Sequence, residues 1–230
     1  MIEDLLPAEV ASVELYGDDP SAFLLAEEAA QFGSAVESRM KEFTSARSCA
    51  RRALSKLGLA QTPILRGANR EPLWPPGVVG SITHCKGFRA ASVAKKSDLL
   101  AIGIDAEVHE ALPPEVFRYA CTDQELCWLA GAPEGTHWDK VLFSAKESVY
   151  KAWFPLTQRW LGFEDVAVTL HPVERKFLAR VLIDAPVIER QPLAAFSGHF
   201  LVRHGLVLTA TLIPRLPGVT TCHQQNCLPS

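Results

Sequence analysis

Two acidic side chains stand two residues apart at the end of an apolar stretch, in the segment Gly103-Ile-Asp-Ala-Glu107. Side chains alternate along a strand, so Asp105 and Glu107 are expected to point to the same face. Mg²⁺ prefers oxygen ligands and fills its remaining positions with water and substrate phosphate. The pair is therefore a candidate cation site, although two acids can also simply mark where a strand leaves the core.

A second signal lies further along the chain, in Phe143-Ser-Ala-Lys-Glu-Ser-Val-Tyr-Lys151. In a helix, Ser144, Glu147 and Lys151 share one face. Glu147 would add a third carboxylate to the cation site, and Lys151 would supply an ammonium group for a phosphate. A solvated Glu-to-Lys pair four residues apart is also common on helix surfaces.

The segment from residue 39 to residue 56 carries six basic residues against one acid, in a chain whose net charge is −3. Arg47 falls on the apolar side of the expected helix, where a plain surface charge is unexpected, and Arg51 follows one turn later. Guanidinium groups match the geometry of phosphate, so this pair is a candidate grip for a phosphomonoester. The alternative is a solvated face whose side chains extend to water.

Polar residues also gather at a turn between two expected strands. Ser81, Thr83 and His84 lie there, and an imidazole can donate a hydrogen bond to a phosphate oxygen. Arg66 and Arg70, in the preceding loop, add positive charge. A lone histidine in a turn is more often structural, and no glycine spacing here forms a phosphate-binding or dinucleotide-binding loop.

Hydrophobic periodicity and breaker residues predict the elements that position these groups. A helix is expected over 34–57, ended by Gly58, and a second over 137–154, closed by Pro155. A helical stretch is expected over 113–130, with Thr122 and Glu125 in capping-box spacing. The expected strands cover 78–83, 88–94, 99–104, 163–170, 176–183, 198–203 and 206–213.

The order of helix followed by strands occurs twice. It predicts an α+β, pseudo-duplicated two-half fold in which each half is a long helix packed on an antiparallel sheet. The halves are expected at 1–108 and 109–217, with a flexible tail at 218–230. The repeat lies in the order of elements, without a residue-level repeat.

Composition limits the class of protein. The 230 residues are 48% hydrophobic and 21% charged, as in a folded chain. Neither the charge nor any apolar run indicates nucleic acid, a membrane or secretion, so a cytoplasmic protein is expected. Six cysteines are then expected as reduced thiols. Neither Cys121 with Cys127 nor Cys222 with Cys227 and His223 has the spacing of a zinc site.

Taken together, these segments resemble the 4′-phosphopantetheinyl transferases, specifically the stand-alone bacterial Sfp/EntD type that forms a pseudo-dimer within one chain. They appear in the family order and cover roughly residues 40–213. The matching segments are Arg70-Glu-Pro-Leu-Trp-Pro75, Gly80-Ser-Ile-Thr-His84, Gly103-Ile-Asp-Ala-Glu107, Phe143-Ser-Ala-Lys-Glu-Ser-Val-Tyr-Lys151, Trp153-Phe-Pro155 and Trp160-Leu-Gly-Phe-Glu-Asp165.

The resemblance implies transfer of 4′-phosphopantetheine from coenzyme A to a serine of an acyl, aryl or peptidyl carrier domain, with release of adenosine 3′,5′-bisphosphate. It implies Mg²⁺, for which Mn²⁺ can substitute, held by Asp105, Glu107 and Glu147. The implied catalytic residues are Glu147, Lys151 and His84. The implied coenzyme A-binding residues are Arg47, Arg51, Arg66, Arg70, Ser81, Thr83, His84 and Lys151.

Several alternatives stay open. Either Glu147 or a water held by the metal could take the serine proton, and Glu107 could bind the metal directly or through water. Rival functions are a noncatalytic coenzyme A or nucleotide-binding module and a Mg²⁺-dependent phosphohydrolase. The internal duplication, which supplies both halves of the site within one chain, favours a monomer. The family type favours carrier proteins of secondary metabolism or siderophore synthesis.

A carrier docking surface is expected near residues 113–130, which offer apolar side chains beside Arg118. These are Val116, Phe117, Leu126, Trp128 and Leu129. Such a composition suits the receipt of a helix face from a partner. An ordinary amphipathic helix packed on its own domain is the alternative.

Overall fold

A computed structural model describes residues 1–31 and 37–215 of the 230-residue chain. The expected tail at 218–230, including Cys222, His223 and Cys227, lies outside the described residues. So does the expected helix start at residues 34–36. No helix in the described ranges is long and apolar enough to span a lipid bilayer.

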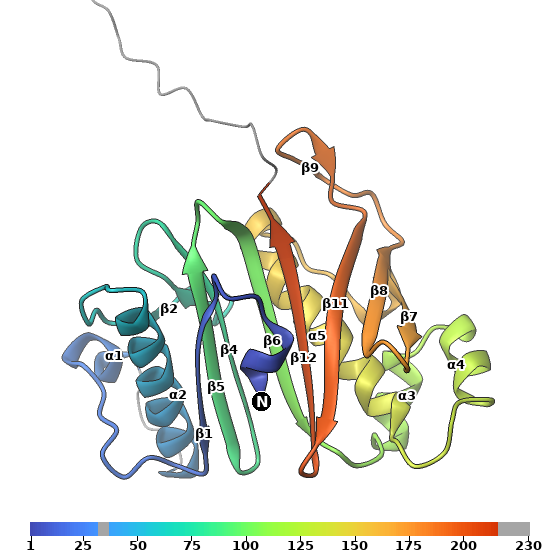
Figure 1. The fold of residues 1–230 in the computed structure, drawn as a ribbon, viewed down its shortest axis with the longest axis horizontal. Helices are drawn as coiled ribbons and strands as arrows, with labels where there is room; N and C mark the ends of the chain where they lie inside the picture. The colour runs from blue at the N-terminus through green and yellow to red at the C-terminus, as the bar shows by residue number, and fades with distance from the viewer. Residues whose placement is uncertain (32–36, 216–230) are drawn as a thin grey trace, which may run out of the picture.

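The N-terminal part is a long helix on a small antiparallel sheet (Figure 1). The sheet has the order β1-β5-β4, formed by β1 (Ala11–Tyr16), β5 (Phe88–Lys95) and β4 (Val78–Cys85). Helix α2 (Glu37–Lys56) packs against β5 and β1. The remaining elements of this part are short: η1 (Ile2–Leu5), α1 (Ala26–Ala30), β2 (Leu65–Arg66) and β3 (Pro72–Leu73).

The C-terminal part repeats this plan on a larger scale. Its five-stranded antiparallel sheet has the order β6-β12-β11-β8-β7, with the long helix α5 (Trp138–Thr157) packed against it. The strands are β6 (Leu99–Val108), β7 (Val166–His171), β8 (Lys176–Val181), β11 (Ala195–Arg203) and β12 (Leu206–Pro214). The shorter elements are α3 (Pro114–Ala120), α4 (Asp123–Leu129), η2 (Phe163–Asp165), β9 (Val187–Ile188) and β10 (Gln191–Pro192). The predicted α+β class, with a long helix on an antiparallel sheet in each half, is confirmed.

Strand β6 joins the two parts and corrects one expectation. The sequence suggested that 99–104 would complete the first half, but β6 pairs with β12 from Leu99 to Val108 and is an edge strand of the second sheet. Its neighbour on the other side is β4, which it contacts extensively. The candidate acids on β6 therefore lie between the two halves, at the seam.

Gly103 explains how α5 lies so close to β6. A Cβ at this position would overlap the carbonyl oxygen of Ser148 on α5, so only glycine allows the helix and the strand to approach this closely. The buried face of α5 also includes apolar residues, among them Val141, Ala145 and Val149. The close approach of β6 and α5 allows the side chain of Asp105, two residues after Gly103 on β6, to reach α5.

Several boundaries differ from the prediction. Pro155 does not close α5: the helix continues to Thr157, before Gln158 adopts a left-handed conformation at φ 53. The stretch 163–165 is a 3₁₀ turn ahead of β7. Residues 113–130 form two helices, and Thr122 and Glu125 form the predicted capping box. Strand β1 was not predicted.

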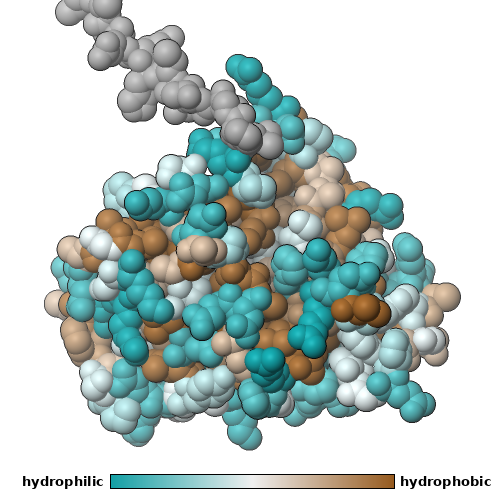
Figure 2. Space-filling view, viewed as in Figure 1, coloured by the Kyte–Doolittle hydropathy of each residue, from teal (hydrophilic) through white to brown (hydrophobic). Residues whose placement is uncertain are grey.

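Hydrophobic residues are not confined to the interior. On the face seen in Figure 2 they appear as separate patches among hydrophilic side chains. In the described ranges four cysteines are free, as expected for reduced thiols.

Candidate active site

Asp105 is the centre of a buried polar cluster between β6 and α5. Its Oδ1 accepts a hydrogen bond from Lys151 Nζ at 2.7 Å, and its Oδ2 accepts one from Ser144 Oγ at 2.8 Å. The Asp105 residue is only 4% exposed, whereas the Lys151 side chain is 26% exposed. The predicted helix face therefore meets the predicted strand acid, and Lys151 connects the cluster to solvent.

Strand β4 reaches the same cluster through hydroxyl groups. The backbone N–H of Ile104 donates to Ser81 Oγ at 3.1 Å, and that of Ala106 donates to Thr83 Oγ1 at 3.0 Å. Thr83 Oγ1 also donates to Asp105 Oδ1 at 3.3 Å. Ser81 and Thr83 are both 3% exposed, so their side chains join β4 to β6 and orient Asp105.

The two glutamates near Asp105 carry perturbed pKa values. Burial, and next the charge of Asp105, raise the pKa of Glu147 to about 7. The same two causes raise the pKa of Glu107, whose carboxylate lies 3.6 Å from Lys140 Nζ. Raised carboxyl pKa values in a partly open cluster are typical of functional sites.

The donor chemistry of these three carboxylates fits a hard divalent cation, because Glu107 and Glu147 both experience the negative charge of Asp105. As the side chains stand, Lys151 occupies Asp105 Oδ1. In the described part of the chain, no three His, Cys, Asp or Glu side chains form a ready-made metal cluster. Among the described residues, Cys121 and Cys127 do not belong to such a cluster either.

A strongly basic cavity of about 390 Å³ lies beside this cluster. Arginines from α2 and from the loop around β2 and β3 line it, and β4 contributes His84. The lining residues include Arg39, Glu42, Phe43, Arg47, Arg66, Arg70, Pro72, Ile82 and His84. Arg39 was not among the predicted site residues, but it lies two turns before Arg47 on the same helix, and that spacing could have indicated it.

The arginines of this cavity repel one another. Arg47 is 5% exposed, and burial followed by the charge of Arg66 lowers its pKa to about 10. Burial, followed by the charges of Arg70 and Arg39, lowers the pKa of Arg66. Burial also lowers the pKa of His84. Cations held together at this cost form a suitable place for an anion with several charges.

Arg51 does not line the basic cavity, although the sequence grouped it with Arg47. Its guanidinium forms a buried ion pair with Glu28 and donates to the Phe23 carbonyl. Glu28 in turn accepts the backbone N–H of Ile64. Arg51 therefore ties α1 and the segment before it to α2.

A third feature is a cavity of about 480 Å³ that adjoins the basic cavity. The two share Arg70, Pro72 and Ile82, and the third cavity also reaches Glu147 and Lys151. Its other walls are largely apolar and aromatic, including Leu73, Trp74, Leu100, Tyr150, Phe154 and Leu156. The basic cavity, the carboxylate-lysine cluster and the apolar cavity thus form one continuous surface.

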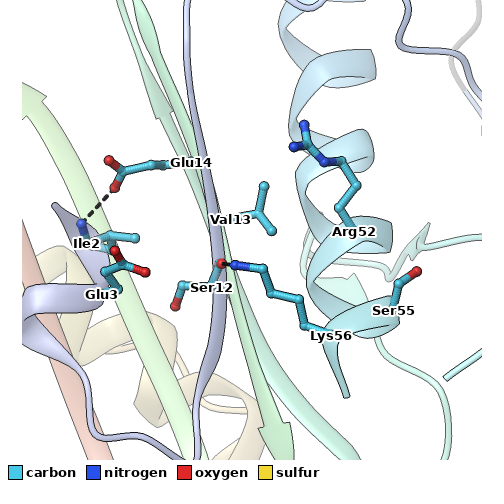
Figure 3. A pocket seen from close by; sticks show the side chains of 8 residues that line it. All are labelled: Ile2, Glu3, Ser12, Val13, Glu14, Arg52, Ser55 and Lys56. Carbon is cyan, nitrogen blue, oxygen red and sulfur yellow. Dashed lines mark hydrogen bonds between the residues drawn. The ribbon is translucent and has the colours of Figure 1, made fainter. Parts of the chain in front are cut away.

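A separate cavity of about 450 Å³ lies between η1, β1 and the C-terminal end of α2 (Figure 3). Two of its charged groups are engaged in holding the N-terminus and the edge of β1. Glu14 accepts the Met1 ammonium at 2.9 Å, and Lys56 Nζ donates to the Ser12 carbonyl at 2.6 Å. None of the predicted site residues lines it, so it is not part of the candidate active site.

The predicted docking segment is partly committed to the core. Trp128 and Leu129 pack against the hydrophobic core of the second half, and Trp128 makes an edge contact with Trp138. Tyr119, which was not among the predicted contacts, is 79% exposed.

Two protein-family models match the chain. Residues 27–94 match the 4′-phosphopantetheinyl transferase N-terminal domain, and residues 101–200 match the 4′-phosphopantetheinyl transferase superfamily. The boundary between the two matches falls just before or within β6.

Relatives match nearly the whole chain. The 4′-phosphopantetheinyl transferase PptT of Mycobacterium tuberculosis is 43% identical over 222 residues, which cover 93% of this chain and 98% of the relative. The 4′-phosphopantetheinyl transferase Svp of Streptomyces mobaraensis is 43% identical over 93% of this chain and 89% of the relative. Enterobactin synthase component D of Salmonella typhi is 33% identical over 59% of this chain and 57% of the relative. The chain therefore belongs to the 4′-phosphopantetheinyl transferase superfamily and is an enzyme of that class.

Proposed function

We propose that this enzyme transfers the 4′-phosphopantetheine arm of coenzyme A to a serine hydroxyl of apo carrier domains and releases adenosine 3′,5′-bisphosphate. The observation that carries the proposal is that the basic cavity adjoins an apolar cavity, and that the apolar cavity reaches Glu147 and Lys151 of the carboxylate-lysine cluster. Coenzyme A combines a phosphomonoester with an adenosine, a diphosphate and a long pantetheine arm, which need these three kinds of surface.

Each surface would hold one part of the donor. Arg39, Arg47, Arg66 and Arg70 would bind the 3′-phosphate and adenosine end, because guanidinium groups match phosphate oxygens. His84 and Lys151 would neutralise the diphosphate. The apolar cavity beside Glu147 would receive the pantetheine arm.

The chain's own groups would then position the reaction. The serine oxygen bonds to the phosphorus that carries the pantetheine arm, and the bond from that phosphorus to the bridging diphosphate oxygen breaks. Glu147 takes the serine proton, because its carboxylate lines the apolar cavity beside Lys151, where the reacting phosphorus would lie. Lys151 stabilises the negative charge that develops on the leaving diphosphate oxygen.

Asp105, Glu107 and Glu147 would hold Mg²⁺, or Mn²⁺ in its place. When bound, the cation supplies charge neutralisation at the diphosphate. Lys151 would have to release Asp105 Oδ1, which its part-exposed position allows. Removal of divalent ions with a chelator is expected to abolish transfer and added Mg²⁺ to restore it. Full activity in the chelator would contradict this assignment.

The acceptors would be acyl, aryl or peptidyl carrier domains. The similarity to a siderophore synthase component supports carriers of secondary metabolism or siderophore synthesis. A monomer is expected, because both sides of the site come from one chain.

Intact mass spectrometry of an apo carrier protein incubated with the enzyme, coenzyme A and Mg²⁺ tests the function. The proposal predicts a carrier that is heavier by one phosphopantetheine arm. An unmodified carrier with intact, bound coenzyme A would indicate a binding module. An unmodified carrier with cleaved coenzyme A would indicate a phosphohydrolase.

A further inference from the structure

Glu42 is an acid in a cavity that is otherwise basic. It lies on α2 between Arg39 and Arg47 and lines the same cavity as both. A carboxylate at this position repels any bound phosphate, so its presence opposes the ligand for which the arginines are suited. Its contacts show what it does instead.

The two oxygens of Glu42 face two different side chains, those of Arg89 and His84. Oε1 accepts a hydrogen bond from Arg89 Nη2 at 3.3 Å, and Oε2 lies 3.9 Å from His84 Nδ1. The second distance is too long for a hydrogen bond but within the range of an ion pair. Glu42 therefore stands between a buried arginine and the histidine of the cavity.

Arg89 is a fixed anchor for this arrangement. Its side chain is 4% exposed, and its guanidinium donates to the carbonyls of Cys85 and Phe88 at 2.5 and 3.0 Å. Asp18 accepts from the same Nη2 at 2.9 Å, so Arg89 already has one carboxylate without Glu42. Neutralisation of Arg89 alone does not require a second acid that faces the cavity.

The geometry points to Glu42 as a positioning residue that holds the His84 imidazole toward bound phosphate, by drawing Nδ1 to itself so that Nε2 is left for the ligand. This inference rests on the proposed function, in which His84 contacts the coenzyme A diphosphate. Charge on a histidine is set by such neighbours, and the nitrogen that faces the ligand is set by the partner of the other nitrogen.

The charges that act on His84 come from several elements. Glu42 on α2 and Asp105 on β6 raise its pKa, whereas Lys151 on α5 and Arg89 on β5 lower it. Burial is the largest cause and leaves the pKa of His84 below its usual value. Loss of the Glu42 charge would leave the imidazole neutral over a wider pH range.

The test is coenzyme A binding to Glu42→Gln, measured by calorimetry at neutral pH on the folded full chain. Gln retains an acceptor for Arg89 and removes only the charge. We expect binding to weaken on the order of fivefold. The pKa of His84, followed by the NMR signal of its ring, is expected to fall. Tighter binding in Glu42→Gln, or unchanged binding, would overturn the proposal.

Two further variants separate the explanations. Asp18→Asn removes the charge of the other acid that is bonded to Arg89. Asp18 is not the acid that faces His84, so this variant should leave coenzyme A binding unchanged. An equal loss in both variants would show that Glu42 only neutralises Arg89. In a His84→Ala background, Glu42→Gln should no longer weaken binding. If His84→Ala itself leaves coenzyme A binding intact, the proposed role of His84 fails, and the inference about Glu42 fails with it.

Discussion

Arg47 and Arg51 lie one turn apart on α2 and are similarly buried, but they have different partners. Arg51 is 3% exposed and its guanidinium is bonded to Glu28 and to the Phe23 carbonyl. Arg47 is 5% exposed, donates its Nε to the Ile64 carbonyl at 2.8 Å, and lines the basic cavity with Arg66. Burial is the same, so the difference lies in the partners: an acid within the fold for Arg51, and a cavity for Arg47.

Helix α5 shows the same contrast with lysines. Lys146 and Glu125 form an ion pair whose side chains are each 2% exposed, and Lys146 also donates to the Phe163 carbonyl. Lys151 pairs with Asp105 beside the apolar cavity and remains 26% exposed. Charged side chains that are paired with buried partners hold elements together, whereas charged side chains that line a cavity are available to a ligand.

The largest effect is expected from a carboxylate that faces the cavity. Glu147→Gln keeps the shape of the side chain but removes the charge, so transfer to an apo carrier should fall on the order of 100-fold or more. The melting temperature should not fall, because the carboxyl already carries an unfavourable, raised pKa. Steady-state kinetics and thermal unfolding measure both. Near-normal turnover in folded Glu147→Gln would remove Glu147 from the chemistry.

The ion pair between Arg51 and Glu28, which is buried within the fold, should respond in the opposite way: its loss should lower stability. Arg51→Met leaves the Glu28 carboxylate buried without its cation, which is expected to cost about 3–5 kcal/mol of unfolding free energy. Denaturant titration measures this loss. The double variant Arg51→Met with Glu28→Gln should recover part of the stability. A single variant as stable as the parent would show that the pair is not structural.

The site could be predicted from the sequence where residues share one element. Strand alternation and helix spacing bring such residues to facing positions, and in the structure Ser144 and Lys151 do bond to Asp105. The sequence grouped Arg51 with Arg47, whereas the structure pairs it with Glu28, which lies in a short helix without a strong periodic signal. Pairing between residues so far apart in the sequence depends on tertiary packing, and the spacing of residues along one helix carries no information about it.

The fold shows the same limit. The long helices and most strands of the two sheets followed from periodicity, but strand β1 and the pairing of β6 with β12 did not. Strand partners far apart in the sequence are set by the packing of α5 on β6, and Gly103 allows that contact. The basic cavity is also a tertiary feature, since its arginines come from α2 and from the loop around β2 and β3.

A smaller effect is expected at the predicted carrier surface. Tyr119 is 79% exposed on α3, so Tyr119→Glu should raise the KM for an acidic carrier by a few-fold and leave coenzyme A affinity unchanged. Kinetics with a whole carrier protein measure the first, and calorimetry the second. Tyr119→Phe is the matched control, since it keeps the ring. If the KM for the carrier stays constant in Tyr119→Glu, the carrier docks elsewhere.

The smallest effect is expected at a solvated ion pair. Lys41 and Glu37 lie 2.7 Å apart on α2, with side chains that are 59% and 81% exposed. Lys41→Ala should shift the melting temperature by no more than about 1 °C and leave transfer unchanged. A large loss of either would mean that a charge can be important without burial or a cavity, contrary to the contrast between Arg47 and Arg51.

The most direct measurement compares coenzyme A with dephospho-coenzyme A, which lacks the 3′-phosphate, as ligands of Arg47→Ala and Arg51→Met. Calorimetry at equal ionic strength, on protein shown to be folded, gives the four dissociation constants and the parent values. Arg47→Ala should weaken coenzyme A binding roughly ten- to hundredfold and dephospho-coenzyme A binding much less, since a charged contact to phosphate is lost. Arg51→Met should preserve the ratio between the two ligands. Equal losses for both ligands in Arg47→Ala, or a selective loss in Arg51→Met, would contradict the account.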